Sequence, residues 1–426
     1  MRYWCEHAWL DSSGVRSSVL VEESDGRITA VTPDSPCPPD AHRLAGLVLP
    51  GFANAHSHAF HRALRGRTHA DGGTFWTWRT GMYALAGKLD PDSYLKLATA
   101  VYAEMALAGV TCVGEFHYVH HAPGGARYSD PNAMSEPLRE AASAAGIRVT
   151  LLDTCYLAGG IDQPLSPEQS RFSDGSVDAW ASRVSSLRSD STLLAGAAIH
   201  SVRAVPRSVL PALVSAWPAG PLHVHLSEQP AENEACLATY GLSPTELLAE
   251  AGALSPRTTA VHATHLSTKD ISLLGGSRTG ACFCPTTEAD LADGIGPARE
   301  LVDAGSTLSL GSDQHAVIDP LLEARALEHG ERLRTGQRGR FTPAELFSAL
   351  TAHASLGWEP GFADLVAISL DTPRTAGCLP EQAMLVATGA DVHTVIASGK
   401  VIAEDGHHRV GDVGRLLAEA IEELWR

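Results

Sequence analysis

The feature that most restricts the fold of this chain is a set of eight short apolar runs, each followed by a stretch long enough for an amphipathic helix. The runs lie at residues 47–52, 110–116, 148–153, 194–200, 222–226, 259–263, 280–284 and 307–311. Runs of this kind are typical of strands that are buried on both faces, and their alternation with helices predicts parallel strands joined by crossovers. Eight such units predict an α/β fold, the closed (β/α)8 TIM barrel.

The two ends of the chain have a different pattern, with short β-rich runs broken by glycine and aspartate. These runs lie at residues 17–22, 27–31, 363–368, 384–387, 392–397 and 400–402. Neither end is long enough to bury a core of its own. The sequence therefore predicts one small β-sandwich domain with a C-terminal helix, made of residues 1–49 and 356–426, beside a (β/α)8 barrel of residues 50–355.

The composition excludes several classes of protein. Of the 426 residues, 44% are hydrophobic and 19% charged, which is enough for a large core and is unlike a disordered chain. The net charge of −17 argues against a nucleic-acid groove, which needs clustered lysine and arginine. The sequence shows neither a secretory leader pattern nor an apolar stretch of the ~20 residues that cross a membrane. With eight cysteines and no CxxC pair, we expect reduced thiols, with packing roles for Cys282 and Cys284. Together these features predict a cytoplasmic enzyme without nucleic-acid or membrane partners.

Polar residues gather after the apolar runs, at the end of the strands where barrel enzymes carry their chemistry. His56 and His58 follow the first run and project to one side, because they are two residues apart on an extended segment. A further histidine from a later run and the late Asp313 would complete a four-ligand N/O set suited to zinc or another divalent ion. The other polar residues at run ends are Glu115, His117, Tyr118, His200, Arg203, His225, Glu228, His262 and His265.

Several segments carry a resemblance to a known family. The segment PGFANAHSH at 50–58 resembles the first-strand motif of the amidohydrolase superfamily, and 363–368 resembles the strand with which its small β domain resumes. A narrower resemblance, from about residue 47 to 340, is to the N-formimino-L-glutamate deiminases of histidine catabolism. It rests on HSHAFHRALRG, FWTWRTGMY, GEFHYVHH, IHSVRAV, HVHLSEQ, VHATHLS, TTEADLADGI and LGSDQHA.

The resemblance implies a function and a set of site residues. The implied reaction is hydrolytic deimination of N-formimino-L-glutamate to N-formyl-L-glutamate and ammonia, by a homodimeric enzyme with one divalent ion, Zn²⁺ or Fe²⁺. The implied metal ligands are His56, His58, His225 and Asp313. The implied catalytic residues are His262, Glu228 and Asp313. The implied substrate-binding residues are His61, Arg79, Tyr118, His200 and Arg203, and His61 departs from the family pattern because a glutamine is expected there.

The residue types agree with this chemistry. A bound zinc lowers the pKa of its water from 15.7 to about 7, and Asp313, His262 and Glu228 can then move protons. Arginine can pair with a carboxylate through two hydrogen bonds, so Arg79 and Arg203 suit a dicarboxylate substrate. Two-metal amidohydrolases generally bridge their ions with a carboxylated lysine. The lysines between His58 and His225 are Lys88 and Lys96, on a predicted outer helix, which favours one metal.

Three alternatives stay open at this point. The same metal site could serve a deaminase of another amidine or of a nucleobase such as guanine or cytosine. A hydrolase that opens a cyclic amide is disfavoured because a bridging lysine is missing. A non-catalytic barrel protein is opposed by the intact ligand positions. His265, at a helical offset from His262, is expected to pack rather than to react.

Overall fold

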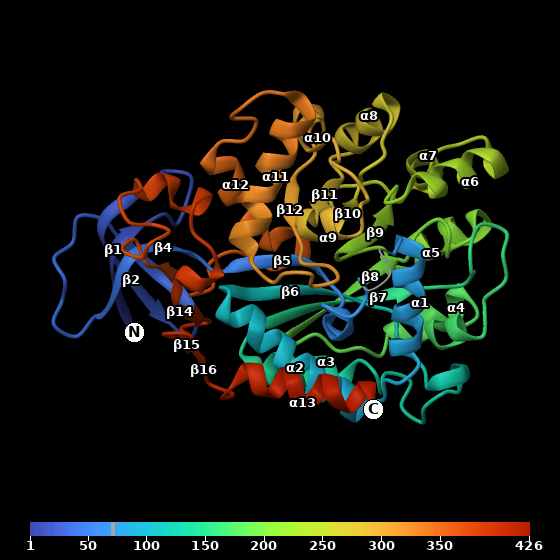
Figure 1. The fold of residues 1–426 in the computed structure, drawn as a ribbon, viewed down its shortest axis with the longest axis horizontal. Coiled ribbons are helices and arrows are strands. Elements are labelled where there is room, and N and C mark those ends of the chain that lie inside the picture. The colour runs from blue at the N-terminus through green and yellow to red at the C-terminus, as the bar shows by residue number, and fades with distance from the viewer. Residues whose placement is uncertain (70–72) are drawn as a thin grey trace.

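In the computed structural model, which describes residues 1–69 and 73–426, eight parallel strands follow one another around a barrel (Figure 1). They are β5 (Phe52–Ser57), β6 (Val110–His117), β7 (Arg148–Cys155), β8 (Leu193–Ile199), β9 (Leu222–Leu226), β10 (Thr258–His262), β11 (Gly280–Phe283) and β12 (Leu308–Leu310). A parallel bridge between Ser57 and Asp313 closes the sheet. The predicted (β/α)8 barrel is confirmed.

Helices surround the barrel. They are α1 (Phe75–Ala86), α2 (Pro91–Leu107), α3 (Glu136–Ala145), α4 (Val177–Val184), α5 (Leu210–Ala216), α6 (Pro230–Tyr240), α7 (Pro244–Glu250), α8 (Thr268–Gly276), α9 (Pro285–Asp290), α10 (Ala298–Ala304), α11 (Pro320–Thr335) and α12 (Pro343–Leu350). Asp90, Ser243, Ser267 and Thr342 begin four of them with reciprocal capping boxes, which satisfy amides that the first helical turn leaves free. None of the helices in the described ranges has the length and apolarity that a bilayer crossing requires.

Short 3₁₀ helices connect these elements. They are η1 (Ala59–Leu64), η2 (Pro123–Gly125), η3 (Glu168–Phe172), η4 (Arg207–Val209), η5 (His353–Leu356), η6 (Pro380–Leu385) and η7 (Gly389–Asp391). The strand predicted at 384–387 is wrong. The chain there forms η6 and a turn, in which the Val386 and Ala387 amides both donate to the Ala383 carbonyl.

The second sheet is built from both termini, as predicted for the small β-sandwich domain. Its strands are β1 (Arg2–Ala8), β2 (Arg16–Ser24), β3 (Arg27–Thr32), β4 (His42–Pro50), β13 (Leu365–Ile368), β14 (Val392–Ala397), β15 (Lys400–Glu404) and β16 (His407–His408). They are ordered β16-β15-β14-β13-β4-β1-β2-β3, so the two halves of the chain meet at the antiparallel pair β4–β13.

The prediction that the run at 47–52 forms the first barrel strand is wrong. Residues 47–50 end β4 of the small sheet, and the barrel strand β5 begins at Phe52. The chain passes between the two sheets at Gly51, where an added Cβ would lie 2.2 Å from the Thr111 hydroxyl oxygen. One apolar run therefore serves two sheets, because both strands are buried and a single residue separates them.

Helix α13 (Val413–Trp425) lies along α2 of the barrel (Figure 1). Lys96 of α2 pairs with Glu423 at 2.9 Å, and Lys88 donates to the Leu424 carbonyl. The Trp425 indole donates to the carbonyl of Ala63 in η1. The division of the chain at 49/50 and 355/356 stays a prediction, since the C-terminal helix packs on the barrel.

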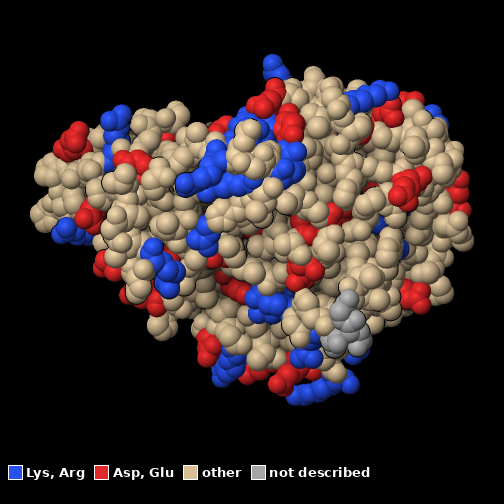
Figure 2. All heavy atoms as spheres, turned by 45° about the horizontal axis from the view of Figure 1, so that its top comes forward, with Lys and Arg blue, Asp and Glu red and all other residues tan. Residues whose placement is uncertain are grey.

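Charged side chains of both signs are scattered over the mostly uncharged face drawn in Figure 2, with one band of basic residues near its upper middle. At the end of α11, Arg332 pairs with Glu328 and Arg334 pairs with Glu331. Since neighbouring carboxylates balance these arginines, the end of α11 carries little net positive charge.

A buried ion pair joins the barrel to the small domain. Arg148 of β7 donates to both oxygens of Asp364, which precedes β13. The same carboxylate accepts hydrogen bonds from the Thr111 hydroxyl of β6 and the Ser398 amide of the β14–β15 turn. Burial opposes ionisation of Asp364, but the Arg148 guanidinium and these donors lower its pKa below the ordinary value. One carboxylate thus connects four segments.

Asp364→Ala is expected to lower the free energy of unfolding by about 3–5 kcal/mol, because Arg148 stays buried without its counter-ion. Urea unfolding measures this loss. The contribution of Asp364 is present above its unfolded-state pKa of about 3.9 and disappears as the pH falls through the lower folded-state pKa, so the difference narrows in acid. Asp40→Ala, which removes an exposed partner of Arg2, is the control and should cost less than about 0.5 kcal/mol. A loss below about 1 kcal/mol for Asp364→Ala would contradict this role.

Candidate active site

The four residues predicted to bind metal meet at the carboxyl ends of the strands. His56 belongs to β5 and His58 follows it, His225 belongs to β9, and Asp313 follows β12. The Nε2 atoms of His56 and His58 each lie 3.5 Å from Oδ1 of Asp313. The Nε2 atoms of His56 and His225 are 3.2 Å apart, and all four side chains are buried. The predicted set therefore forms one cluster.

The spacing of these atoms fits a small divalent cation. Bonds of about 2.0–2.1 Å to nitrogen and oxygen place neighbouring ligand atoms of a tetrahedral site about 3.3 Å apart. Burial lowers the pKa of His58 to about 3 and the pKa values of His56 and His225 well below their usual range. The rings are therefore neutral and present lone pairs, as a metal ligand must.

Hydrogen bonds orient two of these rings. Nδ1 of His58 lies 2.8 Å from the Phe116 carbonyl, and Nδ1 of His225 lies 2.9 Å from the His200 carbonyl. Because a carbonyl can only accept, each Nδ1 carries the proton and each Nε2 is left with a lone pair directed at the cluster. The backbone is also strained next to these histidines, since Asp313 has a positive φ of 43°.

A buried carboxylate holds the segment that carries the first two histidines. Glu115, at the end of β6, accepts hydrogen bonds of 2.7 Å from the Ser57 hydroxyl and from the Ala59 amide. Burial raises the pKa of Glu115 to about 7, against the effect of these donors. Sequence reasoning placed Glu115 at a strand end but gave it no task, and the structure shows it holding the turn that follows β5.

The three side chains predicted to be catalytic, those of His262, Glu228 and Asp313, lie close together. Nε2 of His262, at the end of β10, lies 3.6 Å from Oε1 of Glu228 and 3.8 Å from Oδ2 of Asp313. Burial alone would lower the pKa of His262, but the neighbouring carboxylates, Glu228 first, raise it well above the usual value. His262 also approaches the metal cluster, with a nitrogen within 4.8 Å of those of His56 and His225.

A cavity of about 280 Å³ opens onto this cluster. All the site residues predicted from the sequence line it except His56, which is buried beside His58 and His225. Its wall also contains the aromatic side chains of Phe75, Trp76, Trp78, Tyr83, Tyr156 and Phe172. The metal cluster and the predicted substrate-binding residues thus share one chamber.

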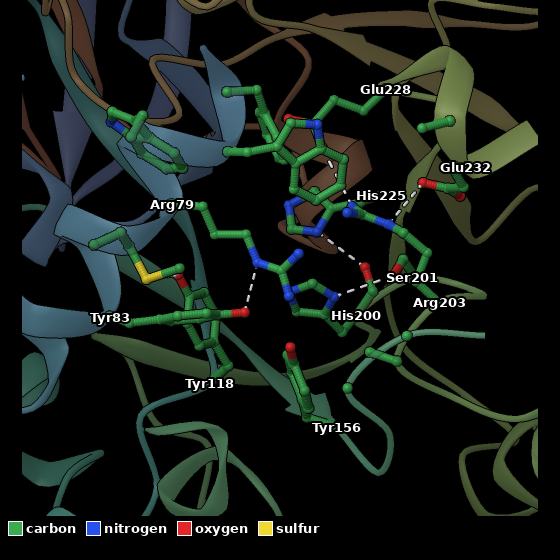
Figure 3. A pocket seen from close by; sticks show the side chains of 18 of the residues that line it. Arg79, Tyr83, Tyr118, Tyr156, His200, Ser201, Arg203, His225, Glu228 and Glu232 are labelled. Atoms are coloured by element: carbon green, nitrogen blue, oxygen red, sulfur yellow. Dashed lines mark hydrogen bonds and ion pairs between the residues drawn. The ribbon is translucent and has the colours of Figure 1, made fainter. Parts of the chain in front are cut away.

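Arg79 reaches the cavity from α1 and points to its middle (Figure 3). Its Nε donates a 2.6 Å hydrogen bond to the Tyr83 hydroxyl, and its guanidinium lies 5.4 Å from the Trp76 ring centroid. Among the residues that the structure describes, no carboxylate pairs with Arg79. Its positive charge is therefore available to a ligand.

Arg203 enters the cavity from the other side, beside Glu232 (Figure 3). Its Nε lies 3.0 Å from Oε2 of Glu232, and its Nη2 lies 3.4 Å from Oε2 of Glu228. Sequence reasoning missed Glu232, which is buried in the first turn of α6. The sequence carried no special signal for it, because acidic residues are common in the first turn of a helix.

The remaining predicted binding residues lie between the two arginines and the metal cluster. The Tyr118 hydroxyl is 2.8 Å from Nε2 of His61, and Nδ1 of His200 is 3.2 Å from the Ser201 hydroxyl. His61 is buried and its ring centroid is 4.5 Å from that of His58. The departure from the family pattern therefore lies inside the site.

Two other predictions concern residues near the site. His265 lies outside the cluster, where its Nε2 is 2.8 Å from the Asp293 carbonyl, so it has a packing role as expected. All eight cysteines are free thiols. Cys282 and Cys284 are buried, and Cys284 leaves β11 to become the N-terminal cap of α9.

The amidohydrolase family model matches residues 47–402, which is most of the chain. The chain belongs to the amidohydrolase family. This amidohydrolase is 35% identical to the formimidoylglutamate deiminase of Pseudomonas aeruginosa, over 95% of each chain. It is 31% identical to the 8-oxoguanine deaminase of the same species, over 96% of this chain and 94% of that one.

Solved structures agree with this assignment. An amidohydrolase from Brucella melitensis matches with a TM-score of 0.93 at 29% identity, over 100% of both chains. A zinc-bound adenosine deaminase from Xanthomonas campestris has a TM-score of 0.84 at 22% identity, over 100% of this chain and 97% of that one, which shows the shared fold. This amidohydrolase is therefore a hydrolase that acts on C–N bonds, and its buried N/O cluster fits a divalent metal ion.

Metal analysis tests the cluster directly. His58→Ala and Asp313→Ala are each expected to weaken metal affinity by at least 10–100-fold, because each removes one of four ligands. The expected readouts are loss of bound metal after dialysis and a lower melting temperature that added zinc does not restore. His265→Ala removes a nearby histidine outside the cluster and should keep its metal. Wild-type metal content in both ligand variants would refute the site.

Proposed function

We propose that this amidohydrolase converts N-formimino-L-glutamate to N-formyl-L-glutamate and ammonia, a step of histidine degradation. The observation that carries the proposal is Arg79, a half-buried guanidinium in the cavity whose charge no described carboxylate balances, in the same chamber as the metal cluster. The 35% identical relative supports it, because that relative is a formimidoylglutamate deiminase.

The proposal assigns the diacid tail to the wall opposite the metal cluster. Arg79 can form two parallel hydrogen bonds with one carboxylate. Arg203 keeps Nη1 for a ligand, while its Nε and Nη2 face Glu232 and Glu228. Tyr118 and His200 supply neutral hydrogen-bonding groups between the arginines and the metal ligands. A neutral base would leave the half-buried charge of Arg79 without a counter-ion among the described residues, whereas a ligand carboxylate would supply one.

The formimino carbon would then lie near His262, Glu228 and Asp313. When bound by His56, His58, His225 and Asp313, a divalent ion supplies Lewis acidity, which lowers the pKa of water towards about 7. The second carboxylate oxygen of Asp313 accepts the proton of the attacking water. His262 stabilises the charge on the attacking oxygen as water adds to the formimino carbon. Glu228, which lies within 4 Å of Nε2 of His262, transfers a proton to the departing ammonia.

We propose one ion, with zinc favoured and Fe²⁺ the alternative that the same N/O donors would accept. Lys88 and Lys96 are the lysines between His58 and His225 in the sequence, and both contact the C-terminal helix α13 rather than the cavity. The carboxylate of Glu115 is engaged by Ser57 and Ala59, which argues against it as a bridge between two ions. The homodimer and the cytoplasmic location stay predictions.

A substrate panel tests the function. Ammonia release is measured with formiminoglutamate, formiminoaspartate, formiminoglycine, 8-oxoguanine, guanine and cytosine. Formiminoglutamate is expected to have a kcat/KM at least about 10-fold above that of formiminoglycine, since losing one or two charge-assisted hydrogen bonds of about 1.5–3 kcal/mol each costs at least this much. Preference for 8-oxoguanine would overturn the proposal and assign the cavity to a nucleobase.

Arg79→Met tests the tail contact. The variant is expected to raise KM for formiminoglutamate roughly 10–100-fold, because a charge-assisted pair of about 1.5–3 kcal/mol is lost, and to leave kcat/KM for formamidine nearly unchanged. Arg207→Met is the control, since Arg207 pairs with Glu250 at the surface. Equal losses with formiminoglutamate and with formamidine would show that Arg79 maintains the structure of the site and does not bind the tail.

A further inference from the structure

Glu288 is a buried carboxylate beside the candidate active site. It has no part in the proton transfers proposed for Asp313, His262 and Glu228. It lies on α9, directly after β11, and is 5% exposed. Its Oε1 accepts a 2.9 Å hydrogen bond from the amide of Cys284. The same oxygen is 3.5 Å from Nδ1 of His262. Glu288 therefore faces the edge of the His262 ring that is turned away from Glu228 and Asp313.

His262 needs such a partner to keep one orientation. Its Nε2 faces Glu228 and Asp313, while its Nδ1 faces Glu288. A 180° flip of an imidazole exchanges Nδ1 with Cδ2 and Nε2 with Cε1, so a flipped ring would turn a C–H rather than a nitrogen towards Glu228 and Asp313. A carboxylate at Nδ1 favours the form with a proton on that atom, as the aspartate of a Ser-His-Asp triad does. The backbone of His262 is itself strained, with a φ of 68°, so the surrounding contacts have to hold this residue in place.

The helix that carries Glu288 is itself firmly held. Glu323 of α11 accepts a 2.9 Å hydrogen bond from the Thr286 amide and a second bond from the Thr286 hydroxyl. Gln314 donates a 2.7 Å hydrogen bond to Asp290 at the other end of α9. Because both ends of the short helix are fixed to neighbouring elements, the carboxylate of Glu288 has a defined position next to His262.

We propose that Glu288 is a positioning residue for hydrolysis. Its carboxylate holds Nδ1 of His262, so that Nε2 stays directed at Asp313, Glu228 and the reacting carbon. The inference rests on the proposed role of His262 but not on the identity of the substrate, because Glu288 is not among the described residues that line the cavity. It acts through His262 alone.

The competing explanation is that Glu288 only caps α9 through the Cys284 amide. Glu288→Gln separates the two, because the amide oxygen of glutamine still accepts that hydrogen bond while the negative charge is lost. The positioning role predicts a kcat lower by roughly 10–100-fold, the usual cost of removing an outer partner of a site residue, with KM and metal content close to wild type. A capping role predicts wild-type kcat.

A double-mutant cycle with His262→Asn shows whether Glu288 acts through the ring. In the His262→Asn background, Glu288→Gln is expected to have almost no further effect on kcat. Glu328→Gln is the matched control, since Glu328 is also buried and accepts the Phe341 amide at 2.7 Å, far along the chain from His262. The control should keep wild-type kcat in both backgrounds.

A measurement without substrate completes the test. Long-range ¹H–¹⁵N spectra of histidine side chains, with the His262 signals assigned by their loss in His262→Asn, report which ring nitrogen carries the proton. We expect a protonated Nδ1 whose shift changes in Glu288→Leu and not in Glu328→Gln.

The inference is overturned if Glu288→Gln keeps kcat within twofold of wild type, if its loss is equal in both backgrounds, or if the Nδ1 shift is unchanged in Glu288→Leu. Failure of the proposed function has a different outcome: the wild type then hydrolyses 8-oxoguanine or another amidine instead of formiminoglutamate. The same cycle is run on whichever substrate is hydrolysed, and the spectra need none.

Discussion

Closure of the barrel between β12 and β5 is the constraint on which the site depends. The amide of Asp313 donates to the carbonyl of His56, and the amide of His58 donates to the carbonyl of Asp313. Below them, the side chains of Asn54 and Ser312 are 2.7 Å apart. The backbone bonds that close the sheet are therefore the ones that set His56 and His58 beside Asp313. The ligand cluster is a direct product of the fold.

The chamber above this cluster has two ends of different character. Around His262 there are three carboxylates, those of Glu228, Asp313 and Glu288. Around the far wall there are two guanidinium groups among aromatic rings. Arg203 connects the ends, because it contacts both Glu228 and Glu232, and a ligand carboxylate that binds it has to share the guanidinium with them. Recognition and proton transfer are thus electrostatically linked within one chamber.

Sequence reasoning found what periodicity and residue type encode. The eight alternating runs predicted the barrel, and the strand-end positions of His56, His58, His225 and Asp313 place them where the structure brings them together. The run at 47–52 was misread because two buried strands of different sheets are separated only by Gly51. Hydropathy cannot distinguish the sheet to which a buried strand belongs.

The partners of the site residues were harder to foresee. Glu232 and Glu115 matter through contacts with Arg203 and Ser57, which are distant in sequence, and a lone glutamate in a helical or strand pattern has no special signal. Likewise, no sequence pattern indicates that Arg203 enters the cavity already paired with Glu228 and Glu232. Such pairings depend on the curvature of the barrel, which residue spacing does not record.

The pairing of β4 with β13 has a consequence for folding while the chain is being synthesised. Strand β4 carries the buried Leu47, Val48 and Leu49, and one of its two edges is covered by β13, which is made only after the whole barrel. During synthesis, an apolar strand edge therefore stays open while the barrel forms, and such an edge can pair with other nascent chains. Since Asp364 directly precedes β13, the residue that joins the two domains arrives together with the strand that ends this exposure.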